Sequence, residues 1–200
     1  MVARYGSPRE GWQDGVGTAS REVAFLAAAS AAIAAPFAQT LSLQGVKFTV
    51  KARCEDSMQT LVVKTREGAV AFPAIKQQVD GSVTAAEVED LNSDGRPELV
   101  LTMVSAGNGS YGSVLAWSAS KGHTLLPINL PVLTAAQAKG YMGHDRFAVV
   151  ETSLVRIFPI YRDGDSNAKP TGGIRQIDYK MVPGEASWQF QPVRTTNAPK

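Results

Sequence analysis

Residues 90–118 read DLNSDGRPELVLTMVSAGNGSYGSVLAWS, and they contain the clearest pattern in the chain. A polar turn leads into the apolar segment 98–104, which predicts a buried strand. The glycine-rich loop 105–113 follows, with Tyr111 near its centre, and the chain returns as a second apolar segment, 114–118. Two strands joined by such a loop predict a hairpin with an aromatic residue at its tip. A loop of this kind is suited to entering the cleft of another molecule.

Most of the remaining pattern also indicates strands. Short segments in which apolar and polar residues alternate, or in which apolar residues predominate, predict strands at 46–52, 60–65, 85–89, 146–151, 154–161 and 174–182, with a last short strand beginning at Trp188. Asp80-Gly81 between Val79 and Val83 predicts a hairpin turn. Pro73 makes 72–75 an edge strand or a loop, and the tail from Thr195 is expected to be frayed.

One helix is expected, at 134–139. Thr134 is a suitable N-cap, three alanines and Gln137 favour the helix, and Gly140 ends it. The short strands and frequent turns therefore predict an all-β, mainly antiparallel fold. It is a β-sandwich or rolled sheet of about eight strands with one short helix.

The N-terminal part has the texture of an export signal. Residues 23–35 are almost all apolar and alanine-rich, Arg21 precedes them and Pro36 follows. The run is shorter than the roughly 20 residues of a membrane span. We therefore predict a polar extension at 1–20, a signal peptide at 21–38 and a single β-rich domain at 39–200, located in the periplasm. The alternative is a buried alanine-rich helix.

Composition narrows the class of partner. Apolar residues make up 44% and charged residues 19% of the sequence, as in ordinary globular domains. The net charge is +2 and the basic residues are scattered, so a nucleic-acid partner is not expected. A membrane partner is not expected either, once the signal peptide is removed. The single cysteine, Cys54, excludes an internal disulfide framework. It either pairs between chains or is a small residue within a strand, and a homodimer is left open.

The acidic turn carries oxygen-bearing side chains at alternate positions: Asp90, Asn92, Asp94 and, four residues later, Glu98. Such loops hold calcium, and Gly95 permits the sharp bend. However, Leu101 stands where a helix-loop-helix calcium site has its bidentate glutamate. The alternative is a self-capped turn in which the side chains accept hydrogen bonds from neighbouring amides. No other cofactor is expected.

The loop supplies the candidate partner-binding residues: Ser105, Asn108, Gly109, Ser110 and Tyr111. Two interpretations compete. Either Tyr111 inserts into a partner, or it folds back onto the sheet as part of a flexible tip.

Signatures of catalysis are missing. His123 and His144 lie far apart, without zinc-ligand spacing. A Gly-x-Ser-x-Gly motif is absent, and nothing in the local sequence pairs Cys54 with a histidine. We therefore predict that the protein is not an enzyme, and keep a hydrolase with an unrecognised site as a lesser hypothesis.

Several segments, in this order, resemble the periplasmic inhibitors of invertebrate-type (I-type) lysozyme. They are residues 90–98, 105–114 and 140–145, joined by 158–161 and 170–173. The resemblance implies a secreted β-rich domain that pushes a loop into the substrate cleft of a lysozyme.

In that family the loop has a Ser-Gly-x-Tyr pattern, whose serine and tyrosine reach the catalytic carboxylates. The matching positions here are 108–111, and Asn108 stands where the serine is expected, with Ser110 nearby. A second contact from Arg146, Arg162 or Arg175 would fix the register. The alternative function is a calcium-stabilised extracellular adhesion or matrix module built on the acidic turn.

Overall fold

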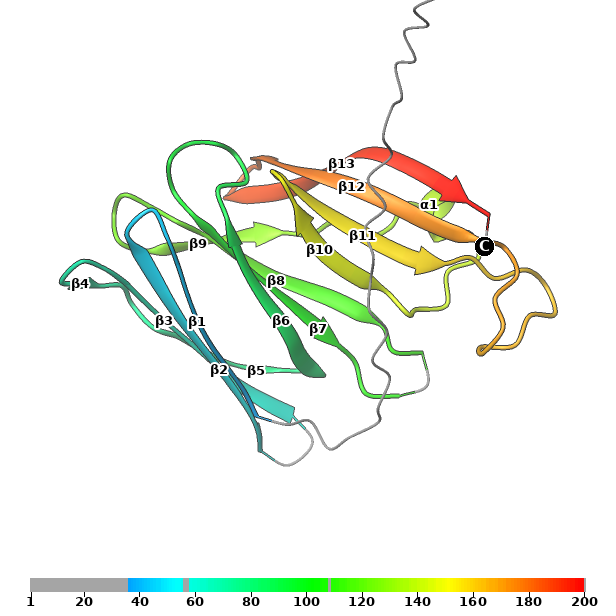
Figure 1. The fold of residues 1–200 in the computed structure, drawn as a ribbon, viewed down its shortest axis with the longest axis horizontal. Helices are drawn as coiled ribbons and strands as arrows, with labels where there is room; N and C mark the ends of the chain where they lie inside the picture. The colour runs from blue at the N-terminus through cyan, green and yellow to red at the C-terminus, as the bar shows by residue number, and fades with distance from the viewer. Residues whose placement is uncertain (1–35, 56–57, 108, 200) are drawn as a thin grey trace, which may run out of the picture. The chain divides into compact units, whose positions relative to one another are not determined.

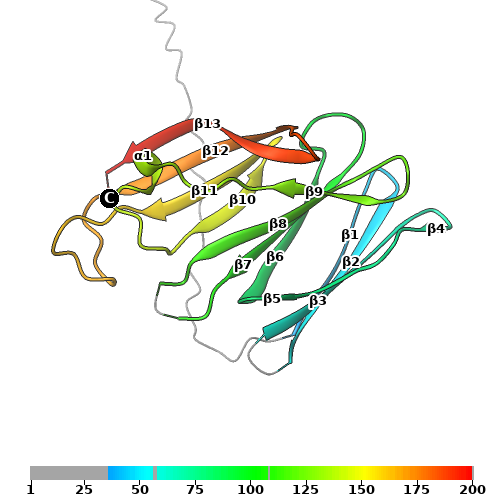
Figure 2. The ribbon, with the colours of Figure 1, turned by 180° about the vertical axis from the view of Figure 1, so that it is seen from behind.

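The computed structural model describes residues 36–55, 58–107 and 109–199. This part contains thirteen strands in two sheets and one short helix (Figures 1 and 2). The all-β, mainly antiparallel prediction is confirmed, although the strands are more numerous than the predicted eight. The polar extension and almost all of the predicted signal peptide lie outside the described residues.

The first sheet has five strands. They are β1 (Phe37–Leu43), β2 (Val46–Glu55), β3 (Met58–Glu67), the two-residue β4 (Val70–Ala71) and β5 (Ile75–Val79). Strand β3 pairs with β2 and, on its other side, with β4 and β5. The alternation in β2 buries Val46, Phe48 and Val50 completely and leaves Lys47 and Lys51 exposed, as expected for a half-buried strand.

The second sheet has eight strands in the order β10-β11-β12-β13-β9-β8-β7-β6. Its members are β6 (Ser82–Glu89), β7 (Glu98–Val104), β8 (Gly112–Ala119), β9 (Leu125–Asn129), β10 (Arg146–Val150), β11 (Ser153–Pro159), β12 (Ile174–Pro183) and β13 (Trp188–Ala198). All pairs are antiparallel except β13 with β9, which are parallel over only two residue pairs.

This sheet curls until it is nearly closed, and a side chain from one edge strand reaches the other. The carboxylate of Glu87 in β6 accepts hydrogen bonds from the backbone N–H of Val149 in β10, at 3.3 Å to Oε1 and 3.2 Å to Oε2. Burial raises the pKa of Glu87, partly offset by this hydrogen bond. The rolled-sheet form of the prediction is therefore the one observed for the larger sheet.

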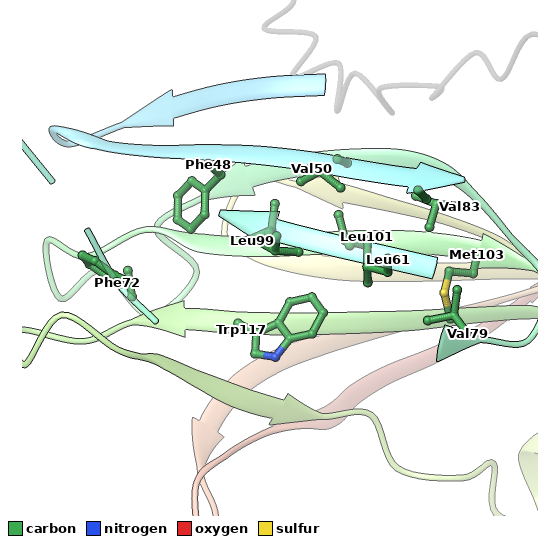
Figure 3. Close-up of a cluster of buried hydrophobic side chains, with 14 of the residues drawn as sticks. Phe48, Val50, Leu61, Phe72, Val79, Val83, Leu99, Leu101, Met103 and Trp117 are labelled. Atoms are coloured by element: carbon green, nitrogen blue, oxygen red, sulfur yellow. The ribbon is translucent and has the colours of Figure 1, made fainter. Parts of the chain in front are cut away.

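Strand β7 contributes to two hydrophobic cores. Leu99, Leu101 and Met103 face the five-stranded sheet and pack in the first core with side chains such as Phe48 (Figure 3). Val100 points to the opposite face, into the second core inside the curled sheet, which also holds Phe158 and Tyr179 among others. Burial on both faces explains why segment 98–104 is mostly apolar instead of alternating, with Glu98 and Thr102 as its two polar residues.

Two local predictions were wrong. Asp80-Gly81 does form a tight turn, with Gly81 at φ +97°, but it does not make a hairpin. Strand β5 pairs with β3 and β6 pairs with β7, so the turn carries the chain from one sheet to the other. The tail from Thr195 is not frayed, because β13 stays paired with β12 as far as Ala198. Strands β1, β4 and β9 were not predicted.

The predicted helix is confirmed as α1 (Ala135–Ala138). The hydroxyl of Thr134 accepts from the backbone N–H of Gln137, whose side chain accepts from the backbone N–H of Thr134. This capping box satisfies amides at the helix start. With four residues, α1 is not long enough to cross a membrane, and no described helix is.

The burial of Leu101 in the first core predicts how much stability the protein loses when this side chain is shortened. Leu101 is fully buried, so Leu101→Ala should lower the free energy of unfolding by about 2–5 kcal/mol, through lost contacts and the cavity left behind. Val132 is 90% exposed, so Val132→Ala is the control and should change stability by about 0.5 kcal/mol or less. Urea denaturation of both variants measures the difference, and equal midpoints would contradict the assignment of Leu101 to the core.

Candidate functional site

The loop 105–113 runs from the end of β7 into the first two residues of β8, and it is closed by its own hydrogen bonds. The backbone N–H of Ser105 donates to the carbonyl of Tyr111 at 2.9 Å, and the N–H of Tyr111 donates to the hydroxyl oxygen of Ser105 at 3.1 Å. The N–H of Ser110 donates to the carbonyl of Gly107 at 3.2 Å. Asn108 lies outside the described residues. The hydroxyl of Ser105 therefore stabilises the loop from within.

The loop rests on residues 140–145, which we call the platform. The backbone N–H of His144 donates to the carbonyls of Gly109 and Ser110, at 2.9 and 3.2 Å. The N–H of Gly112 donates to Oδ2 of Asp145 at 2.9 Å. Contact is so close at Gly143 that a Cβ there would lie 2.1 Å from the carbonyl oxygen of Gly109.

Tyr111 lies on this support with 49% of its surface exposed. Its ring meets the Tyr141 ring edge to face, with centroids 5.7 Å apart and an interplanar angle of 74°. A Cβ at Gly109 would lie 2.3 Å from Cε2 of Tyr111, so any larger residue there would displace the ring. The tyrosine thus packs against the domain on one side and stays open to solvent on the other, and its insertion into a partner stays a prediction.

Below the loop, Asp145 of the platform forms a buried ion pair with β11. Nε of Arg156 in β11 donates to Oδ1 of Asp145 at 2.7 Å, with side-chain exposures of 8% and 0%. The hydroxyl of Tyr141 donates to Oδ2 of Asp145 and accepts from Arg156 at 3.0 Å. Burial, with the neighbouring Asp145 carboxylate, raises the pKa of Tyr141 far above its usual value, so the hydroxyl keeps its proton.

This ion pair has no counterpart among the predicted site residues. The signal for it was present, because Arg156 interrupts the otherwise apolar stretch Leu154-Val155-Arg156-Ile157-Phe158. A charged residue within an apolar strand needs a buried partner of opposite charge. The sequence does not say which acidic residue provides it.

A second loop, residues 160–173, lies at the same end of the sheet (Figures 1 and 2). Nε2 of His144 is 3.0 Å from Oδ1 of Asn167 in this loop, and the hydroxyl of Tyr161 donates to the carbonyl of Asn167 at 2.9 Å. Asp165 accepts from the backbone N–H groups of Arg162 and Thr171, hydrogen bonds that lower its pKa. The second loop is therefore internally bonded and linked to the platform through His144.

The three arginines predicted as second contacts have different environments. Arg175 is buried, and its guanidinium donates to the carbonyls of Ala136, Gln137 and Lys139 at the end of α1. The guanidinium of Arg175 is thus occupied by contacts within the domain. Arg146 and Arg162 are exposed.

The acidic turn forms the hydrogen bonds expected of a self-capped turn. Asp90 accepts from the backbone N–H groups of Asp94 and Gly95, at 3.0 and 2.9 Å. Asn92 also accepts from the N–H of Asp94, and Asp94 from the N–H of Arg96. Within the described ranges, no group of three or more His, Cys, Asp or Glu side chains is arranged to hold a metal ion. Calcium binding stays a prediction.

Arg96, within the same turn, joins the two sheets. Its guanidinium forms a bidentate ion pair with Glu67 of β3, at 2.7 and 2.9 Å, and donates to the carbonyls of Ala119 and Ser120 at the end of β8. The hydrogen bond from Arg96 is the main cause of the lowered pKa of Glu67. The structure thus gives the acidic turn a structural role.

Glu98, the fourth calcium candidate, is completely buried. Its Oε2 accepts from the backbone N–H of Leu91 and its Oε1 from the hydroxyl of Ser118, both at 2.7 Å. Burial raises the pKa of Glu98 to about 7 despite these hydrogen bonds.

The residues considered for catalysis are not brought together. His123 lies near Glu67 and packs edge to face against Phe72, whereas His144 belongs to the platform. Cys54 lies in β2, exposed, with its Sγ 3.8 Å from Nε2 of Gln59. It is thus a strand residue, as one of the two interpretations expected.

The raised pKa of Glu98 predicts that the stability of the protein depends on pH. The unfolded carboxyl ionises near pH 4.5 and the folded one near 7, so the folded state binds the extra proton between these values. Stability should therefore fall as pH rises through this window, by on the order of 3 kcal/mol. Glu98→Gln cannot ionise, yet it can accept from Leu91 and donate to Ser118. Urea denaturation from pH 4 to 8 should show a flatter curve for this variant than for the wild type, and parallel curves would refute the prediction.

Comparison with known proteins gives one family. No curated protein sequence matches the chain. Residues 55–136 match the family model described as periplasmic lysozyme inhibitor of I-type lysozyme. This range includes the acidic turn and the loop 105–113 but not the platform. The match confirms the resemblance noted in the sequence.

Proposed function

We propose that this protein is a periplasmic inhibitor of an I-type lysozyme and that it inserts the loop 105–113 into the substrate cleft of the enzyme. One observation carries the proposal. Within the segment that matches the inhibitor family, Tyr111 stands half-exposed on a loop held by backbone hydrogen bonds. An exposed aromatic residue on a rigid support loses little conformational entropy on binding.

The chemistry of the target supports this loop as the contact. Glycosidases use two carboxyl groups that flank the scissile bond. The hydroxyl of Tyr111 and the hydroxyl of Ser110 are donors suited to such carboxylates, and the sequence places the amide of Asn108 beside them. The tyrosine ring would fill space that a sugar otherwise occupies. Inhibition then needs binding only, without covalent chemistry.

The environment of the nearest carboxylate also favours binding over catalysis. Asp145 lies beneath the loop, and its oxygens accept from Gly112, Tyr141 and Arg156. An acid whose oxygens are already used in a buried ion pair is poorly placed to exchange protons with a substrate. We therefore propose that the protein acts without chemistry of its own.

The proposed location follows from the family and from the N-terminal sequence. The family is described as periplasmic, and residues 21–38 have the composition of a signal peptide. Strand β1 begins at Phe37, which pairs with Ala52, and Ala38 pairs with Lys51. Cleavage before Phe37 would keep all of β1, whereas cleavage after Ala38 would remove its first two residues.

Tyr111→Ala tests the proposal. Removing the ring and hydroxyl should weaken inhibition of an I-type lysozyme by at least about thirtyfold, as for a hot-spot residue worth about 2 kcal/mol or more. The measurement is lysis of bacterial cell walls by I-type, chicken-type and goose-type lysozymes, titrated with the mature protein. Val70→Ala removes an exposed apolar side chain, 46% accessible, from β4 and serves as the matched control.

The outcomes separate the hypotheses. Stoichiometric inhibition that is lost in Tyr111→Ala and kept in Val70→Ala supports the inserted loop. Full inhibition by Tyr111→Ala would move the contact elsewhere on the protein. If the wild type inhibits none of the three lysozymes, the inhibitor proposal is wrong.

A further inference from the structure

We propose that the platform, residues 140–145, fixes residues 109–112 of the loop in their binding conformation before any partner arrives, and that Asp145 is its central positioning residue. The proposal rests on the inhibitor function proposed above. It concerns residues that lie outside the family match at 55–136. Three independent sets of contacts carry it.

The first set is the pattern of hydrogen bonds. Oδ2 of Asp145 accepts from the backbone N–H of Gly112, the residue directly after Tyr111. On the other side of Tyr111, the backbone N–H of His144 donates to the carbonyls of Gly109 and Ser110. The platform therefore holds the loop backbone on both sides of the exposed tyrosine. These bonds join segments that are more than thirty residues apart in the sequence. They therefore restrict movements of the loop that its own hairpin would still allow.

The second set holds Asp145 itself. Its side chain is fully buried, where a lone charge is costly. Arg156 neutralises it through Oδ1, and Tyr141 donates to Oδ2. The Arg156 guanidinium in turn lies 5.1–5.5 Å from the ring centroids of Tyr141, Phe147 and Phe158. The acceptor that faces Gly112 is thus held in place by Tyr141 of the platform and by Arg156 of β11.

The third set is steric. Gly143, at φ +88°, approaches the loop so closely that a Cβ would lie 2.1 Å from the Gly109 carbonyl oxygen and 3.3 Å from Cδ1 of Tyr111. A Cβ at Gly112 would lie 2.6 Å from Cβ of Asp145. The two segments therefore fit together only because both positions are glycine.

Two variants act on the platform by different means. In Asp145→Asn, the amide oxygen can still accept from Arg156, but the NH2 group then faces the N–H of Gly112, which loses its acceptor. Gly143→Ala leaves the ion pair intact and wedges a methyl group under the loop. Gly45→Ala is the matched control, because Gly45 has a similar φ of +81° in the β1–β2 turn and nothing lies within 4 Å of its Cβ position.

The first measurement needs no lysozyme. Amide hydrogen exchange of the free protein, followed by NMR, should be at least about tenfold faster at Gly112 in Asp145→Asn and Gly143→Ala, as for loss of one charge-assisted hydrogen bond. Exchange at Leu101 in the core should stay unchanged, because a general loss of stability would speed both amides. Gly45→Ala should resemble the wild type at both positions.

The second measurement is the inhibition constant against an I-type lysozyme. Both platform variants should inhibit at least about tenfold more weakly than the wild type, chiefly through faster dissociation. Should Asp145→Asn fail to fold, Gly143→Ala still decides the matter.

Two results would overturn the inference: unchanged exchange at Gly112 in Gly143→Ala, or faster exchange with undiminished inhibition. A wild-type protein that inhibits no lysozyme would refute the proposed function and with it the binding role of the platform, while the exchange data would still show whether the platform orders the loop.

Discussion

The burial of β7 on both faces is the constraint on which the remaining structure depends. Leu99, Leu101 and Met103 pack against the five-stranded sheet, while Val100 packs inside the curled eight-stranded sheet. One strand thus belongs to both cores, and neither sheet can shift without disturbing it. Because β7 also pairs with β8 along its whole length, the loop between them starts and ends at fixed points. The stiffness of the site therefore originates in the hydrophobic core.

The elements that the sequence predicts best are those determined by local chemistry. The hairpin of β7 and β8, the alternation in β2 and the capping box at Thr134 all depend on neighbouring residues, and the structure contains them. Where the outcome depends on distant segments, local reasoning fails. Asp80-Gly81 has the composition of a hairpin turn, yet β5 and β6 pair with different sheets. Which strand a turn leads to is decided by packing, which a turn sequence does not encode.

The candidate site shows the same difference between features set by local sequence and features set by distant segments. Tyr111 on a glycine-rich loop is visible in the sequence, and so is Arg156 as a charge within an apolar strand. Their connection through Asp145 is not, because it needs the register of β10 and β11 together with the course of the platform. The acidic turn illustrates the converse. Its oxygens suggest a cation site, but in the fold they bond amides of their own turn, and Glu98 is directed inward.

The contact between Glu87 and Val149 has a consequence for the behaviour of the protein in a crowded compartment. An open sheet edge presents unpaired amides to which a strand of another molecule can add. In β10, one outward amide is already occupied by the two oxygens of Glu87 from the opposite edge. A side chain thereby satisfies this amide, so at this point the seam of the curled sheet offers no free donor to a strand of another molecule. Protection of this kind needs no additional strand.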